Sequence, residues 1–111
     1  MPNNQNLDLT FKTLADPTRR AVLARLTTGS APIKELAAPF EMALPSFMQH
    51  VRMLESAGLV VTEKQGRTRI CTLAPEALSE VEDWLSQQRT TWNARFDRLE
   101  AFLNEETLDG T

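Results

Sequence analysis

The segment ALPSFMQHVRMLESAGLVV, residues 43–61, constrains the fold most strongly because an amphipathic helix pattern in it runs directly into a strand pattern. The apolar residues that recur at helical spacing, and should therefore face a core, are Phe47, Val51 and Leu54. Gly58 follows as a typical C-terminal residue of a helix. We therefore predict a helix over Pro45–Ala57 that packs on one face and presents hydrogen-bonding side chains on the other.

Shorter helix patterns precede this segment. A first helix is expected at about residues 7–15. Asp16 is then placed as an N-cap and Pro17 at the first helical position, which predicts a helix that ends at Gly29. Its apolar stripe consists of Val22, Leu23 and Leu26. The segment APIKELAAPF, residues 31–40, predicts a third short helix, and two short helices joined by a tight turn are typical of a helix-turn-helix.

Two β-rich runs, LVVTEK and TRICTL, follow the amphipathic helix and are separated by the turn-forming residues Gln65, Gly66 and Arg67. They predict a two-stranded hairpin with Lys64, Arg67 and Arg69 at its tip. The apolar anchors expected in this hairpin are Leu59, Val61, Ile70 and Leu73. A basic hairpin directly after a helix-turn-helix is a wing. The predicted fold class is therefore mainly α with a small β-hairpin, a winged helix-turn-helix of five helices plus a two-stranded wing.

A last helix is predicted at about residues 75–103, and its apolar residues form one long stripe. Leu78, Leu85, Trp92 and Leu99 fall seven residues apart, and Val81, Trp84, Phe96, Phe102 and Leu103 widen the stripe. A chain of this size has little left to cover so long a face, so we expect a second copy to cover it. The predicted dimer interface consists of Leu7, Phe11, Leu78, Val81, Leu85, Trp92, Phe96 and Leu99.

Length and composition bound the remaining possibilities. The chain of 111 residues predicts one domain, residues 1–111. It shows no apolar run long enough for a membrane span and no secretory signal, and its single cysteine suits a reducing cytoplasm. The net charge of −3 hides an asymmetry, because residues 17–71 hold eight Lys/Arg against four Asp/Glu while residues 72–111 hold three against nine. The basic middle predicts a basic functional surface.

Four segments together resemble a known family. LADPTRRAVLARL, PIKELA, HVRMLESAGLV and QGRTRICTL resemble, in order and spacing, the ArsR (arsenic-repressor-like) family of winged-helix regulators. The resemblance covers about residues 7–75. The LP dipeptide that opens the amphipathic helix, Leu44 and Pro45, resembles the same position in a subgroup of the family that has no metal ligands. It implies a homodimer in which the first and last helices pair, and a repressor that releases DNA on receiving a signal. One departure is Met48, which stands where the family usually has Ser, two residues before the helix His.

The outer face of the helix over Pro45–Ala57 carries groups that suit DNA. Gln49 can form paired hydrogen bonds with adenine, and Arg52 can do so with guanine. Ser46 can reach a phosphate or a base edge, and Met48 a thymine methyl group. The alternatives are that these are solvated side chains and that the wing cations protect a strand edge. The predicted DNA-binding residues are Pro45, Ser46, Met48, Gln49, His50, Arg52, Lys64, Arg67 and Arg69.

His50 and Cys71 are each the single residue of their type in the chain. His50 lies between the core face and the outer face of its helix. Two roles therefore remain open: a contact with DNA, or a packed side chain that is hydrogen-bonded to nearby backbone. Cys71 shares strand parity with Leu73, which favours a small packed residue over a redox switch. A soft-metal site needs three or four grouped ligands, so we expect no metal site and no cofactor.

These patterns predict a cytoplasmic, sequence-specific DNA-binding regulator. With the family resemblance, which implies a homodimeric repressor, the expectation is a transcriptional regulator that represses by binding an inverted-repeat operator in double-stranded DNA. The sequence leaves open whether a small-molecule effector binds. One candidate site for it is the group of aromatic residues Trp84, Trp92 and Phe96. The alternative is a dimeric protein-interaction module of the same fold that acts through its acidic, aromatic last helix. An enzyme is not expected, because the sequence lacks a nucleophile with a neighbouring base and a glycine-rich phosphate loop.

Overall fold

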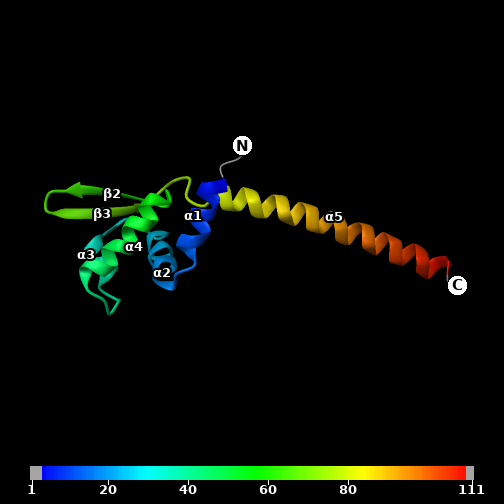
Figure 1. The fold of residues 1–111 in the computed structure, drawn as a ribbon, viewed down its shortest axis with the longest axis horizontal. Helices are drawn as coiled ribbons and strands as arrows, with labels where there is room; N and C mark the ends of the chain where they lie inside the picture. Colours follow the sequence, from blue (N-terminus) through cyan, green and yellow to red (C-terminus); the bar gives the residue numbers. More distant parts are fainter. Residues whose placement is uncertain (1–3, 110–111) are drawn as a thin grey trace. The chain divides into compact units, whose positions relative to one another are not determined.

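The computed structural model describes residues 4–109, with the side chains of residues 6–105. Its helices are α1 (Asn4–Leu14), α2 (Pro17–Leu26), α3 (Ile33–Ala37), α4 (Leu44–Ser56) and α5 (Ser79–Asp109), and its strands are β1 (Ala31–Pro32), β2 (Val60–Gln65) and β3 (Thr68–Leu73) (Figure 1). The strands form an antiparallel sheet in the order β1-β3-β2. The predicted fold class, a mainly helical winged helix-turn-helix, is confirmed.

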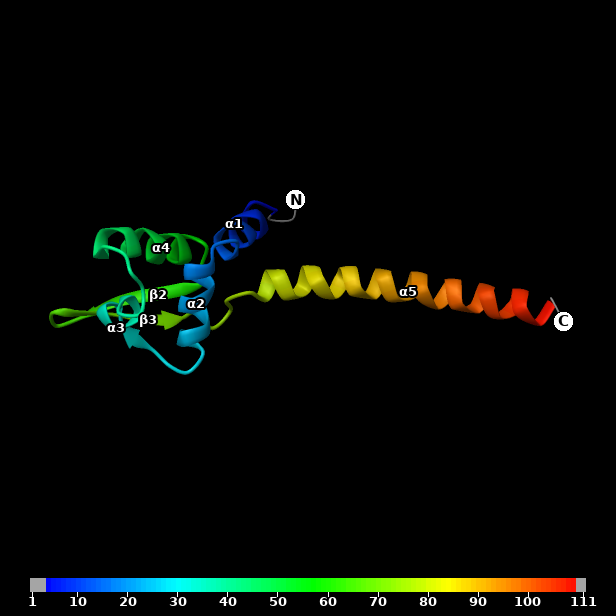
Figure 2. The ribbon, with the colours of Figure 1, turned by 90° about the horizontal axis from the view of Figure 1, so that it is seen from below.

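The chain divides into two compact units, Met1–Leu78 and Ser79–Thr111. In the first unit α4 runs along the β2–β3 hairpin and packs against it (Figure 2). The buried core contains the predicted apolar stripes of α2 and α4, together with apolar residues of α3 and of the sheet. Its members are Val22, Leu23, Leu26, Ala31, Ile33, Leu36, Phe47, Val51, Leu54, Leu59, Val60 and Cys71.

The start of α2 follows the predicted capping pattern. Asp16 is the N-cap, and its carboxylate accepts a hydrogen bond of 3.1 Å from the backbone N–H of Arg19. Pro17 stands in the first turn, where its missing N–H costs no helical hydrogen bond. The helix ends at Leu26, earlier than the predicted end at Gly29.

The prediction of a helix over residues 31–40 is wrong at its start. Ala31 and Pro32 form β1 and pair with β3, opposite Cys71 and Ile70. Pro32 is extended, with φ −63° and ψ 146°, and an edge strand tolerates a residue that has no N–H to donate. The helix is therefore confined to Ile33–Ala37, and the sheet has a third strand that the sequence did not predict.

The prediction that Val61 is an apolar anchor of the hairpin is wrong, because its side chain lies on the solvent side of the sheet. Its side chain is 52% exposed, whereas that of Val60 is 2% exposed. Val60 pairs with Leu73 across the ladder and Thr62 pairs with Cys71, so Val60 and Thr62 turn toward the core while Val61 between them turns to solvent. Sequence alternation alone did not decide between two adjacent valines.

The second unit is the single helix α5. It begins at Ser79, later than the predicted start near residue 75, because Leu78 has a left-handed backbone with φ 71°. The helix extends past the predicted end at residue 103 to Asp109. All side chains from residue 82 to residue 105 are exposed. Within residues 4–109 no helix combines the length and the apolar character needed to cross a lipid bilayer.

Candidate nucleic-acid interface

The helix α4 separates its apolar and polar side chains as predicted. Phe47, Val51 and Leu54 are at most 1% exposed, which anchors the helix in the core. The backbone of Gly58 then turns left-handed, with φ 75°, and the N–H of Leu59 donates to the carbonyl oxygen of Leu54. This fixed end orients the opposite face outward. The predicted DNA-binding residues that this face exposes are Pro45, Ser46, Gln49 and Arg52.

An aromatic pair fixes the turn between α3 and α4. The ring centroids of Phe40 and Phe47 lie 5.6 Å apart, and Phe40 packs against the core from the turn itself. The backbone N–H of Phe40 also donates to the carbonyl oxygen of Ala37 at 3.0 Å. Phe40 therefore sets the angle at which α4 leaves α3, a role that sequence reasoning missed. The signal was a large aromatic residue directly after the helix-stopping Pro39.

The wing gathers positive charge at its tip. Lys64 pairs directly with Arg69 across the strands, and Gly66 makes the turn with φ 65°. Like charges placed opposite each other in an antiparallel pair are destabilising. Within the part of the chain that the structure describes, Lys64, Arg67 and Arg69 are exposed and form no ion pair. An external anion such as a phosphate would relieve this repulsion.

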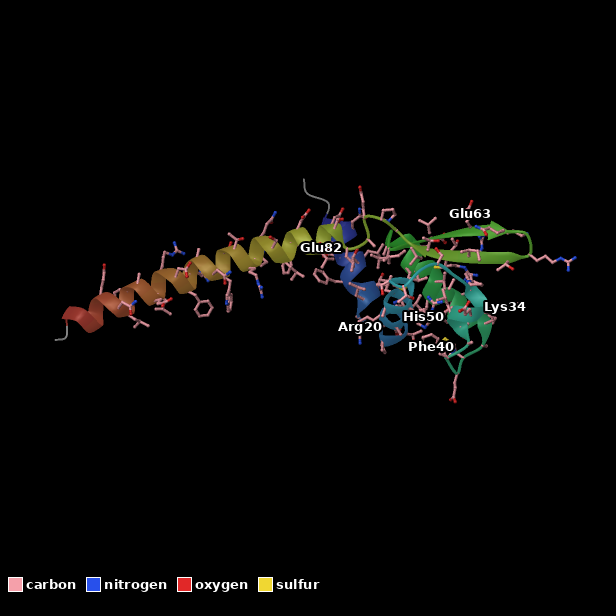
Figure 3. The ribbon with its side chains drawn as sticks, turned by 180° about the vertical axis from the view of Figure 1, so that it is seen from behind. Arg20, Lys34, Phe40, His50, Glu63 and Glu82 are labelled. Carbon is pink, nitrogen blue, oxygen red and sulfur yellow. The ribbon has the colours of Figure 1, made fainter. Side chains whose placement is uncertain are left out.

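His50 does not point freely outward. Its ring nitrogen Nδ1 lies 3.1 Å from a guanidinium nitrogen of Arg19 and 3.8 Å from a carboxylate oxygen of Asp16 (His50 is labelled in Figure 3). The same guanidinium donates to the carbonyl oxygens of Thr13 at 2.6 Å and Lys12 at 3.3 Å. His50 thus ties α4 to α2 and to the end of α1. Sequence reasoning missed Arg19, although DPTRR was among the segments that carried the resemblance.

Asp16 is the acidic member of this cluster. Desolvation raises its pKa, but the hydrogen bond from the Arg19 N–H and the nearby charges of His50 and Arg19 outweigh that effect. The pKa of Asp16 is therefore lower than its ordinary value of 3.8. The carboxylate stays ionised at neutral pH and caps α2 beside the His50 ring.

Met48 differs from its exposed neighbours on α4. It is half-buried and packs against the core cluster. It also lines a hollow of about 370 Å³ between α3, α4 and the wing. Its side chain therefore has an apolar surface that is open to one side of the predicted DNA-binding face.

The stripe on α5 is exposed in the single chain except at Val81, which is 8% exposed and so is already buried without a second copy. Trp92 is 62% exposed, Phe96 53% and Leu99 51%, and the rings of Trp92 and Phe96 meet edge to face at 5.4 Å. Leu78 lies in the turn before α5 and packs against the core of the first unit. The helical part of the predicted interface therefore begins after Leu78.

Cys71 is fully buried in β3, as its strand parity predicted. Burial, with the charge of Glu55 nearby, raises the pKa of its thiol to about 11. The thiol is thus protonated at neutral pH and screened from reagents. Among the residues that the structure describes, no three His, Cys, Asp or Glu side chains are grouped so as to hold a metal ion.

Known proteins are similar to this chain in sequence and fold. Residues 14–63 match the family model described as a helix-turn-helix domain. The chain is 34% identical over 79 residues to the HTH-type transcriptional regulator Rv2034 of Mycobacterium tuberculosis, a match covering 71% of this chain and 74% of that protein. It is 52% identical to RHA00566, an ArsR family transcriptional regulator whose crystal structure superposes with a TM-score of 0.76 over 79% of this chain and 97% of that one. This chain belongs to the ArsR family.

As an ArsR family member, the chain is a transcriptional regulator with a helix-turn-helix DNA-binding domain. The transcriptional repressor SdpR of Bacillus subtilis is 28% identical over 75 residues, which cover 68% of this chain and 83% of that protein. The homodimeric winged helix-turn-helix domain Mb0332 of Mycobacterium bovis is 20% identical and has the same fold, with a TM-score of 0.61 over 85% of this chain and 84% of that one.

Proposed function

We propose that this ArsR family regulator is a homodimeric repressor that binds an inverted-repeat operator. The observation that carries the proposal is the exposed polar face of α4 beside the unpaired cations of the wing. Gln49 and Arg52 would contact base edges in the major groove, and Arg67 and Arg69 would hold the flanking phosphates. The similar protein SdpR, 28% identical over 75 residues, is a transcriptional repressor, which supports the proposal.

The dimer is proposed from the stripe on α5. Large apolar side chains that stay in water forgo roughly 1.5–3 kcal/mol each. Trp92, Phe96 and Leu99 are each more than half exposed, which favours burial against a second copy. We propose that α1 joins α5 in this interface, with Leu7 and Phe11 as its contributions. The homodimeric Mb0332 domain, which has the same fold, supports the proposal.

A selection experiment tests the operator. Full-length chain is incubated with a library of random duplexes, and the retained sequences are read and footprinted. The expected result is an inverted repeat whose half-sites lie about one helical turn apart. Sedimentation of the complex should give two chains for each operator. One chain on a single half-site would contradict the dimeric part of the proposal.

The interaction-module alternative rests on the acidic, aromatic character of α5. In that case the basic middle of the chain would have no role, although residues 17–71 hold twice as many basic as acidic residues. Binding to random duplex at low salt separates the two proposals, because a DNA-binding protein loses affinity steeply as salt rises. No binding even at low salt would favour the module.

A further inference from the structure

The first unit contains a hollow, and only some of its lining residues are among the proposed DNA contacts. It has a volume of about 370 Å³, within the range of small-molecule sites. It lies between the first turn of α3, the first two turns of α4 and the start of β3. Its lining residues are Pro32, Ile33, Lys34, Leu44, Met48, Arg67, Thr68 and Arg69.

One side of the hollow is apolar. Leu44 and Met48 are one helical turn apart on α4, so their side chains share a face. Leu44 is 46% exposed although it is a large apolar residue, and Met48 is half-buried. A sugar–phosphate backbone offers little apolar surface to such a wall. An aliphatic body would cover it and remove that surface from water.

The other side of the hollow is basic. Lys34, Arg67 and Arg69 line it, and no acidic residue is among the lining residues. Glu35, the acidic neighbour of Lys34 in sequence, is held 3.3 Å from Arg25 instead. Across the described residues no ion pair involves Lys34 or the two arginines (Lys34 is labelled in Figure 3). Three uncompensated cations around one hollow favour an anionic group there.

We propose that this hollow binds a small organic anion with an aliphatic body, such as a carboxylate or sulfonate. Its anionic group would pair with Lys34, Arg67 and Arg69, and its aliphatic body would lie on Leu44 and Met48. Binding of the anion to the hollow does not depend on whether the protein binds DNA. That the anion competes with DNA does rest on the proposed function, because the anion would occupy the wing arginines that are proposed to hold phosphates. The hollow then acts as an effector site on the DNA-binding face.

Decanoate, kept below its micelle concentration, is the probe. It is titrated into DNA-free protein with labelled methyl groups, and the methyl signals of Leu44 and Met48 are followed by NMR. Decanol supplies the same chain without the charge, and acetate supplies the charge without the chain. We expect saturable shifts at both residues with decanoate, and at least about tenfold weaker binding of decanol and of acetate.

Variants locate the site. Arg69→Ala and Leu44→Ala should each weaken decanoate binding by about tenfold. Lys64→Ala is the matched control, because Lys64 faces Arg69 across the wing but does not line the hollow. Circular dichroism checks that each variant is folded, which is expected because all three side chains are exposed.

The outcomes are distinct from those of the proposed function. If Lys64→Ala weakened decanoate binding as much as Arg69→Ala does, the cause would be general attraction to a basic surface, and the proposed site would be overturned. Equal binding of decanol and decanoate would show apolar adhesion and overturn it too. In wild-type protein, decanoate should release operator DNA at the concentrations that shift Leu44. If decanoate shifts the methyl signals but does not release operator DNA, only the proposed competition is overturned. If the protein binds operator DNA but decanoate causes no methyl shifts, only the proposed anion site is overturned.

Discussion

Nδ1 of His50 lies 3.1 Å from a guanidinium nitrogen of Arg19, and this contact connects the helix that carries Gln49 and Arg52 to the first turn of α2. The two residues are 31 positions apart in sequence. Because Arg19 also holds the carbonyl oxygens of Thr13 and Lys12, the contact links α4 to the end of α1. His50 is thus a positioning residue for α4, whether or not it also touches DNA.

Substitution of His50 tests this role. His50→Ala should lower the free energy of unfolding by about 1 kcal/mol, because a partly buried hydrogen bond to a charged group is lost. Gln49→Ala, one residue away and exposed, should change it by less than about 0.5 kcal/mol. Urea unfolding at one fixed protein concentration measures both. Equal stability of the two variants would contradict the positioning role.

Asp16 gives a pH-dependent prediction. Asp16→Ala removes the N-cap of α2 and should cost about 1 kcal/mol at neutral pH. Asp16→Asn keeps a capping oxygen but loses the charge that interacts with His50 and Arg19. The pKa of Asp16 is lower in the folded than in the unfolded chain, so its charge stabilises the fold above about 3.8, the ordinary value. That stabilisation is lost as the pH falls through the lower folded pKa.

The measurement is the melting temperature of wild type and Asp16→Asn between pH 7 and pH 3. Wild type should be the more stable at neutral pH, and its margin should shrink as the pH falls from about 5 to 3. A margin that grew between pH 5 and pH 3 would mean that the charge of Asp16 destabilises the fold.

The buried thiol of Cys71 should be slow to react. With a pKa raised to about 11 and no exposed surface, it is protonated and covered at pH 8. We expect alkylation in the folded chain to be roughly a hundredfold slower than in urea, since the core must open first. Cys71→Ala should keep operator affinity. Rapid alkylation, or loss of DNA binding in this variant, would favour a redox switch instead.

The stripe on α5 predicts how assembly responds to one substitution. Trp92→Ala should weaken the dimer by about 2 kcal/mol or more, roughly thirtyfold, because Trp is the residue most often dominant in an interface. Gln87 lies on the other side of the same helix, so Gln87→Ala should leave assembly unchanged. Sedimentation across a concentration series measures both. A wild-type chain that is monomeric at micromolar concentration would remove the basis of this prediction.

The parts of the fold that the sequence predicted are those with local causes. The cap of α2 needs only Asp16 and Pro17, and the burial of α4 follows from apolar residues three and four positions apart. β1 was missed because its pairing partner is β3, far along the chain. The start of α5 was predicted too early because Leu78 takes a left-handed backbone, which leucine rarely adopts.

The same distinction holds for the candidate site. The cations of the wing follow from two β-rich runs and a glycine turn, so their place on one hairpin was predictable. The His50–Arg19 contact was not, because it depends on how α4 crosses α2 in space. The hollow beside Leu44 was also beyond sequence reasoning, since residues of β1, α3, α4 and β3 line it together.

The last prediction separates base recognition from phosphate contact. Gln49 and Arg52 are exposed on α4, and each can form paired hydrogen bonds to a purine edge. Arg67 is exposed beside the turn of the wing, where a charge can follow phosphates without contacting bases. Losing a base contact should cost about 1–3 kcal/mol on the operator and little on random duplex. Losing a phosphate contact should weaken both and flatten the salt dependence by about one unit of slope for each subunit.

The measurement is the affinity of folded wild type and variants for operator and for a scrambled duplex across a salt series. Gln49→Ala and Arg52→Ala should reduce the ratio between the two affinities, with the salt slope on scrambled duplex unchanged. Arg67→Ala should lower both affinities in parallel and reduce the slope. If Arg67→Ala alone changed the ratio, the two roles would be exchanged between wing and helix. If no variant altered binding, α4 and the wing would not form the DNA-binding surface, and the proposed function would fail at its central contact.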